Sequence, residues 1–242
     1  MYQRLRCVAL RTVKYDDRKS IVTAWSAELG RVSMIVPAGA SREAQRRRAL
    51  MMPLSLFEGE VDVRPGRELL SIRDVRPMRV LAELCTEPTK AVVAMFLSEV
   101  LEKVLREEQA DAALTAFLFD AVEHLDVMQR PAGVANFPLV FLYRLGHFIG
   151  IQPDASCWCK GYYFDMRGGQ FLASMPMSNQ FLDPEETTVA ALLSRLNFYN
   201  SQRFRLPRQL RRDALARILR YYTLHHTNLE NLNSLPVVSE VF

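Results

Sequence analysis

The hydrophobic period of the chain changes once, at about residue 80, and this change limits the fold more than any other feature. Before it, apolar residues alternate with polar ones, as at Val61 and Val63, which is the period of a β-strand. After it, apolar residues recur every three or four positions, as at Val92, Phe96 and Val100, which is the period of a helix. The sequence therefore predicts a β-structured head followed by a helical body.

The head contains four or five short alternating segments separated by turn residues. Glu28, Leu29 and Gly30 lie between two β-branched runs and predict the turn of a hairpin. Several short strands in so few residues are typical of a small closed barrel, and a five-stranded barrel with a basic face is typical of the OB-fold. We expect an α+β protein, with an N-terminal OB-fold β-barrel for nucleic-acid binding at residues 1–80.

Residues 81–242 are expected to form a helical domain, interrupted by a short β-like knuckle at about 154–181. The helical periods cover residues 87–108, 111–128, 137–150, 183–200 and 206–226. Pro88 suits the first turn of the first of these helices. Asp183, Pro184 and Glu186 have the spacing of a capping box at the start of another.

Charge is divided unevenly along the chain. Residues 1–80 carry 16 Lys and Arg against 9 Asp and Glu, residues 81–200 carry 8 against 15, and residues 201–242 carry 7 against 3. The head and the tail are thus basic and the middle is acidic. Basic blocks favour polyanions, because phosphate neutralisation releases counterions.

The basic residues of the head gather at two places. Arg42, Arg46, Arg47 and Arg48 lie in a segment between two strands, which we interpret as a flexible basic loop suited to a phosphate backbone. The other DNA-contact candidates of the head flank two turns; they are Lys14, Arg18, Lys19 and Arg31. The aromatic candidates for stacking on unpaired bases are Tyr2, Tyr15 and Trp25. The alternative is a solvated charged surface, with Trp25 in the core of the barrel.

A second basic cluster spans residues 203–220, with seven arginines and one acid. Its DNA-contact candidates are Arg208, Arg211 and Arg212. Alternatively, these arginines pair with the acidic middle of their own chain.

The four cysteines are Cys7, Cys85, Cys157 and Cys159. Their spacing gives no disulfide framework, which favours a reducing cytosol. Cys157 and Cys159 are the candidates for a metal site, but structural zinc takes four ligands and the next fifty residues contain neither Cys nor His. We therefore expect no zinc, and we expect aromatic packing around a turn at Gly168 and Gly169 to hold the knuckle.

Other function classes find little support. The sequence has no P-loop, no GxGxxG, no GxSxG and no HExxH motif, so we expect no enzyme and no cofactor. It also has no apolar run of about 18 residues and no apolar leader, so we expect neither a membrane span nor a secretory signal.

The order of these features resembles the RecO family of DNA repair proteins. The similar segments are Gly30-Arg31-Val32, the small-residue turn Ala38-Gly39-Ala40, the basic segment Arg42 to Arg48, the run Leu50 to Leu56, and the stretch Leu145 to Cys157. Many members carry two CxxC pairs that bind zinc. This chain has only Cys157 and Cys159, and Ser174 to Gln180 stand where the second pair is expected.

The resemblance implies a recombination mediator that responds to DNA damage and is not an enzyme. Such a protein binds single- and double-stranded DNA, anneals complementary strands and helps to load recombinase onto DNA coated with single-strand-binding protein. It implies a RecR-like partner, contact with the acidic C-terminal tail of the single-strand-binding protein, and a cytoplasmic, nucleoid-associated location. We expect the groove for that tail near Phe141, Arg144 and Leu145, although Phe141 and Leu145 also suit a helix core.

Two other functions fit the residues. One is a protein-interaction module that does not bind DNA, in which the arginines serve solubility. The other is a zinc-dependent regulator built around the knuckle. Salt dependence of DNA binding separates the first from the DNA-binding hypothesis, and the metal content of the purified protein separates the second.

Overall fold

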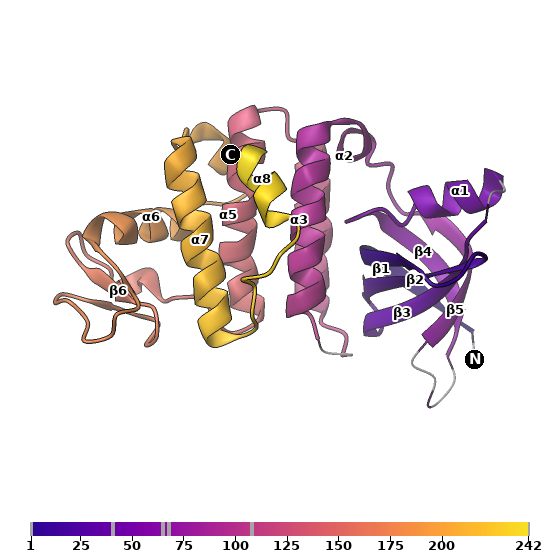
Figure 1. Ribbon diagram of the computed structural model, residues 1–242, viewed down its shortest axis with the longest axis horizontal. Coiled ribbons are helices and arrows are strands. Elements are labelled where there is room, and N and C mark those ends of the chain that lie inside the picture. Colours follow the sequence, from indigo (N-terminus) through magenta and orange to yellow (C-terminus); the bar gives the residue numbers. More distant parts are fainter. Residues whose placement is uncertain (1, 40–41, 64–65, 67–68, 107–108, 242) are drawn as a thin grey trace. The chain divides into compact units, whose positions relative to one another are not determined.

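The alternating segments of the head form five strands, β1 (Tyr2–Lys14), β2 (Lys19–Ser26), β3 (Gly30–Pro37), β4 (Leu56–Asp62) and β5 (Leu69–Pro77). They close into a barrel in the order β1-β2-β3-β5-β4 (Figure 1). Only the β3–β5 pair is parallel within this barrel. Leu5, Met34 and Phe57 are among the residues that fill its interior. The predicted OB-like barrel is confirmed.

The structure is a computed structural model that describes residues 2–39, 42–63, 66, 69–106 and 109–241, without the side chains of residues 43 and 241. Ala40, the last residue of the small-residue turn, lies outside this range. Within the described part, Gly30 completes the β2–β3 turn with a φ of 73°. Glycine adopts this left-handed conformation without a steric penalty, which explains the predicted hairpin.

The basic segment between β3 and β4 is a helix, α1 (Arg42–Ala49), and not the flexible loop that the sequence predicted. Ala44 is buried, and Met51 just after the helix lies in the core of the barrel. The hydroxyl of Thr12 on β1 donates a 2.9 Å hydrogen bond to the carbonyl oxygen of Met51. These contacts fix α1 at one end of the barrel (Figure 1).

Besides α1, three described helices belong to the same compact unit as the barrel, Met1–Val127. They are α2 (Ala82–Thr86), α3 (Pro88–Val104) and α4 (Ala112–Val127). The buried ammonium of Lys90 on α3 donates to Glu83 Oε2 at 2.8 Å and to the carbonyl oxygen of Asp126 at 2.5 Å, so one side chain connects all three. Pro88 occupies the first turn of α3, as predicted.

The second compact unit is Met128–Phe242. It contains α5 (Pro131–Phe148), η1 (Ala155–Cys157), α6 (Pro184–Arg195), η2 (Ser201–Arg203), α7 (Arg208–His225) and α8 (Leu235–Val241). The capping box of Asp183 and Glu186 is present. The buried hydroxyl of Tyr222 donates to the carbonyl oxygen of Leu142 at 2.6 Å, which joins α7 to α5.

The knuckle is a small sheet of β6 (Tyr163–Asp165), β7 (Gln170–Leu172) and β8 (Phe181–Leu182), in the order β7-β6-β8. Phe164, Met166 and Leu182 form its buried centre, with Phe171 and Tyr221 packed against them. Gly168 and Gly169 form the predicted turn. Hydrophobic packing therefore connects the knuckle to α7.

The knuckle does not fit a zinc ion. Cys157 and Cys159 are both exposed thiols. Within the described residues, the side chains of His, Cys, Asp and Glu nowhere form a group of three that is placed to hold a metal ion. Two ligands do not complete the tetrahedral set of a structural zinc. In the same part of the chain, no helix has the length and apolar character needed to cross a lipid bilayer.

Candidate nucleic-acid interface

Trp25 belongs to the interior of the first unit. Its side chain is buried, and its indole Nε1 donates a 2.9 Å hydrogen bond to the hydroxyl of Thr115 on α4. A ring that is covered on both faces cannot stack on a base. Of the two alternatives, the structure places Trp25 in the core.

Arg31 and Arg11 also reach toward the helices. Nη1 of Arg31 donates to the carbonyl oxygens of Glu102 and Leu105, at 2.6 and 2.7 Å, at the C-terminal end of α3. Arg11 pairs with Glu102 at 3.0 Å. Because helix ends expose unpaired carbonyl groups, a cation here satisfies the end of α3. OB-folds commonly bind ligands on β2 and β3, and here that part of the barrel contacts α3 and α4.

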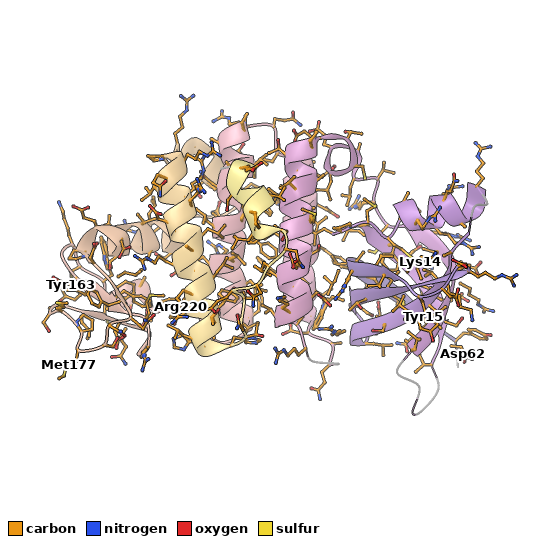
Figure 2. The ribbon with its side chains drawn as sticks, viewed as in Figure 1. Lys14, Tyr15, Asp62, Tyr163, Met177 and Arg220 are labelled. Carbon is orange, nitrogen blue, oxygen red and sulfur yellow. The ribbon has the colours of Figure 1, made fainter. Side chains whose placement is uncertain are left out.

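The β1–β2 turn is the open part of the barrel. Lys14, Tyr15, Arg18 and Lys19 are all exposed, and Figure 2 shows Lys14 and Tyr15 projecting from the barrel. Lys14 pairs with Asp17 at 2.7 Å, whereas the side chains of Arg18 and Lys19 make no ion pair within the described residues. Tyr15 is 64% exposed, so its ring is available for stacking.

Helix α1 presents most of its arginines to solvent. Arg42, Arg46 and Arg48 are exposed, and in the described part of the chain none of them pairs with an acid. Arg47 is half-buried. An exposed guanidinium without an internal partner is able to form a bidentate pair of hydrogen bonds with a phosphate. The structure thus leaves most of the predicted basic segment available to a ligand.

A groove of about 510 Å³ lies between α1 and β5. Arg46, Arg47 and Leu50 line it on one side, and the segment from Asp74 to Pro77 lines it on the other. Arg76, an exposed residue of this segment, was missed in the sequence. Its position in the last strand of the head carried no signal of its own, because only the fold brings β5 beside α1.

Tyr2 is already stacked within the protein. The guanidinium carbon of Arg73 lies 3.6 Å from the centre of the Tyr2 ring, and Arg73 also pairs with Glu60 at 2.9 Å. The hydrogen bond to Glu60 raises the pKa of Arg73 above its usual value. One face of Tyr2 is therefore occupied by a cation.

The C-terminal arginines are largely bound inside the second unit. Arg208 donates to the carbonyl oxygen of Glu240 at 3.1 Å, and Arg211 donates to that of Leu206. Burial and the neighbouring Arg208 lower the pKa of Arg211, while Arg212 is exposed. Further along α7, Arg217 pairs with Glu186 of the acidic middle block at 2.6 Å.

Two of the residues predicted to form the partner-tail groove lie in the hydrophobic core. Phe141 and Leu145 are fully buried in the second unit, so a partner cannot touch them in this structure. Arg144 donates to the carbonyl oxygen of Leu196 at 3.1 and 2.7 Å. Their burial follows from the very apolar α5, which packs on several sides at once.

An apolar groove of about 90 Å³ does occur on the same unit, between α5, α6, α7 and the knuckle. Leu142, Tyr143, Ile218 and Tyr221 line it, and Arg217 stands among its polar residues. Burial raises the pKa of Tyr221 to about 12, and it raises that of Tyr143 as well. Both phenol groups are therefore neutral near neutral pH, and the charged residues at the groove are Glu186, Asp213 and Arg217.

Two family models match the chain, one over the barrel and one over most of the remaining residues. The family model "Recombination protein O N terminal" matches residues 1–81, and "Recombination protein O C terminal" matches residues 85–236. The chain is 35% identical to the DNA repair protein RecO of Phocaeicola vulgatus and 30% identical to that of Azobacteroides pseudotrichonymphae, each over the full length of both chains. It is 33% identical to the DNA repair protein RecO of Bacteroides fragilis, again over both full lengths. With a closed OB-like barrel, a helical body and full-length relatives of one kind, the chain belongs to the RecO family of DNA repair proteins.

Proposed function

We propose that this protein is a recombinational repair mediator that binds single- and double-stranded DNA at the end of its barrel that carries the β1–β2 turn and α1. The observation that carries the proposal is a set of exposed cations at this end that make no ion pair within the described residues: Arg18, Lys19, Arg42, Arg46 and Arg48. Lys14 and Arg47 lie beside them. Phosphate neutralisation by such a set supplies affinity without sequence preference.

We further propose that the bound protein anneals complementary strands and helps to load recombinase onto coated DNA. Annealing requires neutralised phosphates and accessible bases, and it breaks no covalent bond. A protein with this task needs no catalytic group, so the role proposed here is that of a mediator and not of an enzyme. Residues 1–80 would carry DNA contact and residues 81–242 partner contact, in a cytoplasmic, nucleoid-associated protein.

The partners we propose are a RecR-like protein and the acidic, apolar C-terminal tail of the single-strand-binding protein. The groove of Leu142, Tyr143, Ile218 and Tyr221 is the better place for this tail, because its lining is apolar and Tyr143, Ile218 and Tyr221 are only half-buried. Arg217 at the groove, which pairs with Glu186 in this structure, would exchange that carboxylate for an acidic residue of the tail. Replacing Ile218 by Glu should abolish binding of a tail peptide, and leave DNA affinity as it is.

Strand annealing tests the proposed function. Two complementary strands, one fluorescent and one quenching, are coated with the cognate single-strand-binding protein and mixed with this protein. Annealing should accelerate with the intact single-strand-binding protein and much less with a form that lacks its acidic tail. Equal rates with and without this protein would contradict the mediator role.

A further inference from the structure

Asp74 on β5 has a φ of 51°, in the left-handed region that glycine adopts freely and that Asn and Asp adopt more often than other residues. The cause is a bulge. Glu58 pairs with Arg76 and Glu60 pairs with Arg73, so Asp74 and Val75 together oppose the single residue Gly59.

Gly59 shows that the bulge is tightly built. A Cβ atom at this position would stand 2.8 Å from Cδ1 of Ile72 and 3.0 Å from the carbonyl oxygen of Arg73. The two strands therefore approach each other closely at the bulge. Bulges often redirect a side chain at a binding site.

Asp74 is an exposed acid among cations, and its charge acts on the neighbouring Arg73. Asp74 lines the groove of about 510 Å³ together with Arg46, Arg47 and Arg76. In the described part of the chain, Asp74, Arg46 and Arg76 make no ion pair with any residue. An acid in this groove weakens the binding of a phosphate, but it can accept a hydrogen bond from a ligand that carries a donor group.

We propose that this groove holds one nucleotide of a single DNA strand, and that Asp74 selects the base. Arg46 and Arg76 bind the flanking phosphates, and the Asp74 carboxylate accepts a hydrogen bond from an amino group of the unpaired base. The volume of the groove is that of a small-ligand site. The inference rests on the proposed function, because it assigns a base preference to the same DNA-binding surface.

The chemistry of the bases gives the direction of the preference. An ionised carboxylate is an acceptor only. Cytosine presents the N4 amino donor, whereas thymine presents the O4 acceptor in the same place. A carboxylate therefore attracts the edge of cytosine and repels that of thymine, so a cytosine strand should bind more tightly than a thymine strand.

The test compares oligo(dC) and oligo(dT) of equal length by fluorescence anisotropy at one salt concentration. The wild-type protein should bind oligo(dC) about five- to tenfold more tightly, the discrimination expected for one good base contact. In Asp74→Gly the ratio should fall to about one, mainly because oligo(dT) binds better. Glycine suits the left-handed conformation, so this variant keeps the fold. In Asp74→Asn the side-chain amide both accepts and donates, so it can meet cytosine and thymine alike, and the ratio should again fall to about one.

Asp120→Asn is the matched control, because it removes an exposed acid of the same unit on α4. It should leave the ratio unchanged. Equal binding of the two strands by the wild-type protein, or a ratio that survives Asp74→Gly, would overturn the inference and leave the proposed function intact. Failure of the wild-type protein to bind either strand in a salt-dependent way would contradict the proposed function and this inference with it.

Discussion

Trp25 on β2 donates its indole hydrogen bond to the hydroxyl of Thr115 on α4, at 2.9 Å. This contact commits one of the most suitable stacking side chains of the barrel to the interior of its own unit. Together with the bonds of Arg31 to the end of α3, it leaves the β1–β2 turn and α1 as the open basic part of the barrel. The proposed interface lies there for this reason.

Thr115→Val should destabilise the first unit without affecting DNA binding. The substitution leaves the buried indole N–H of Trp25 without its acceptor, which costs about 1–3 kcal/mol. Urea unfolding followed by circular dichroism measures the loss, and anisotropy at two salt concentrations measures DNA affinity. A stable variant with weakened DNA binding would show that this contact belongs to the interface.

Arg31→Ala should likewise act on stability. The side chain satisfies two carbonyl oxygens at the end of α3, so we expect the free energy of unfolding to fall by about 1–3 kcal/mol. The slope of log affinity against log salt should stay at its wild-type value. A slope reduced by about one would instead identify Arg31 as a phosphate contact.

Much of the fold could be predicted from the sequence, because local patterns determine it. Alternation gave the barrel, Gly30 its hairpin, and Asp183 with Glu186 a capping box that the structure contains. The short helices α1 and α2 were not predicted. Their residues are few, and α1 is so rich in arginine that its apolar side reduces to Ala44.

The candidate site was harder to predict, because it depends on contacts between distant segments. Arg31 and Arg46 carry the same charge in the sequence. Only the fold shows that Arg31 is bound to α3, whereas Arg46 makes no ion pair within the described residues. Phe141 and Leu145 are apolar residues of the kind that line a binding groove. They do not line one here, because α5 is buried around most of its circumference. Arg76 belongs to the site only because the fold places β5 beside α1.

The knuckle should keep its stability without its cysteines. We expect the double variant Cys157→Ser, Cys159→Ser to unfold at the wild-type temperature, with or without a chelator, because both thiols are exposed. Phe164→Ala should cost about 3–5 kcal/mol, since it empties the centre of the small sheet. Stoichiometric zinc in the purified protein, or a chelator that lowers the unfolding temperature, would contradict this account.

Stability should decline at high pH through Tyr221. Its folded-state pKa of about 12 lies above the usual value of about 10. The stabilisation from its neutral form is therefore complete below about pH 10 and is lost as the pH rises toward 12. Unfolding free energies measured across this range should fall less steeply in Tyr221→Phe. Identical slopes in the two proteins would show that Tyr221 titrates alike in the folded and unfolded states.

The arginines of α1 test the central claim most directly. The affinity for a labelled single strand is measured at several salt concentrations for three proteins. They are the wild type, a triple variant in which Arg42, Arg46 and Arg48 of α1 are replaced by Ala, and a control in which Lys160, Arg167 and Arg195 are replaced by Ala. Each lost phosphate contact reduces the slope by about 0.7, so the α1 variant should lose about two in slope and the control nothing. An unchanged slope in the α1 variant, or an equal loss in the control, would contradict DNA binding at this end of the barrel.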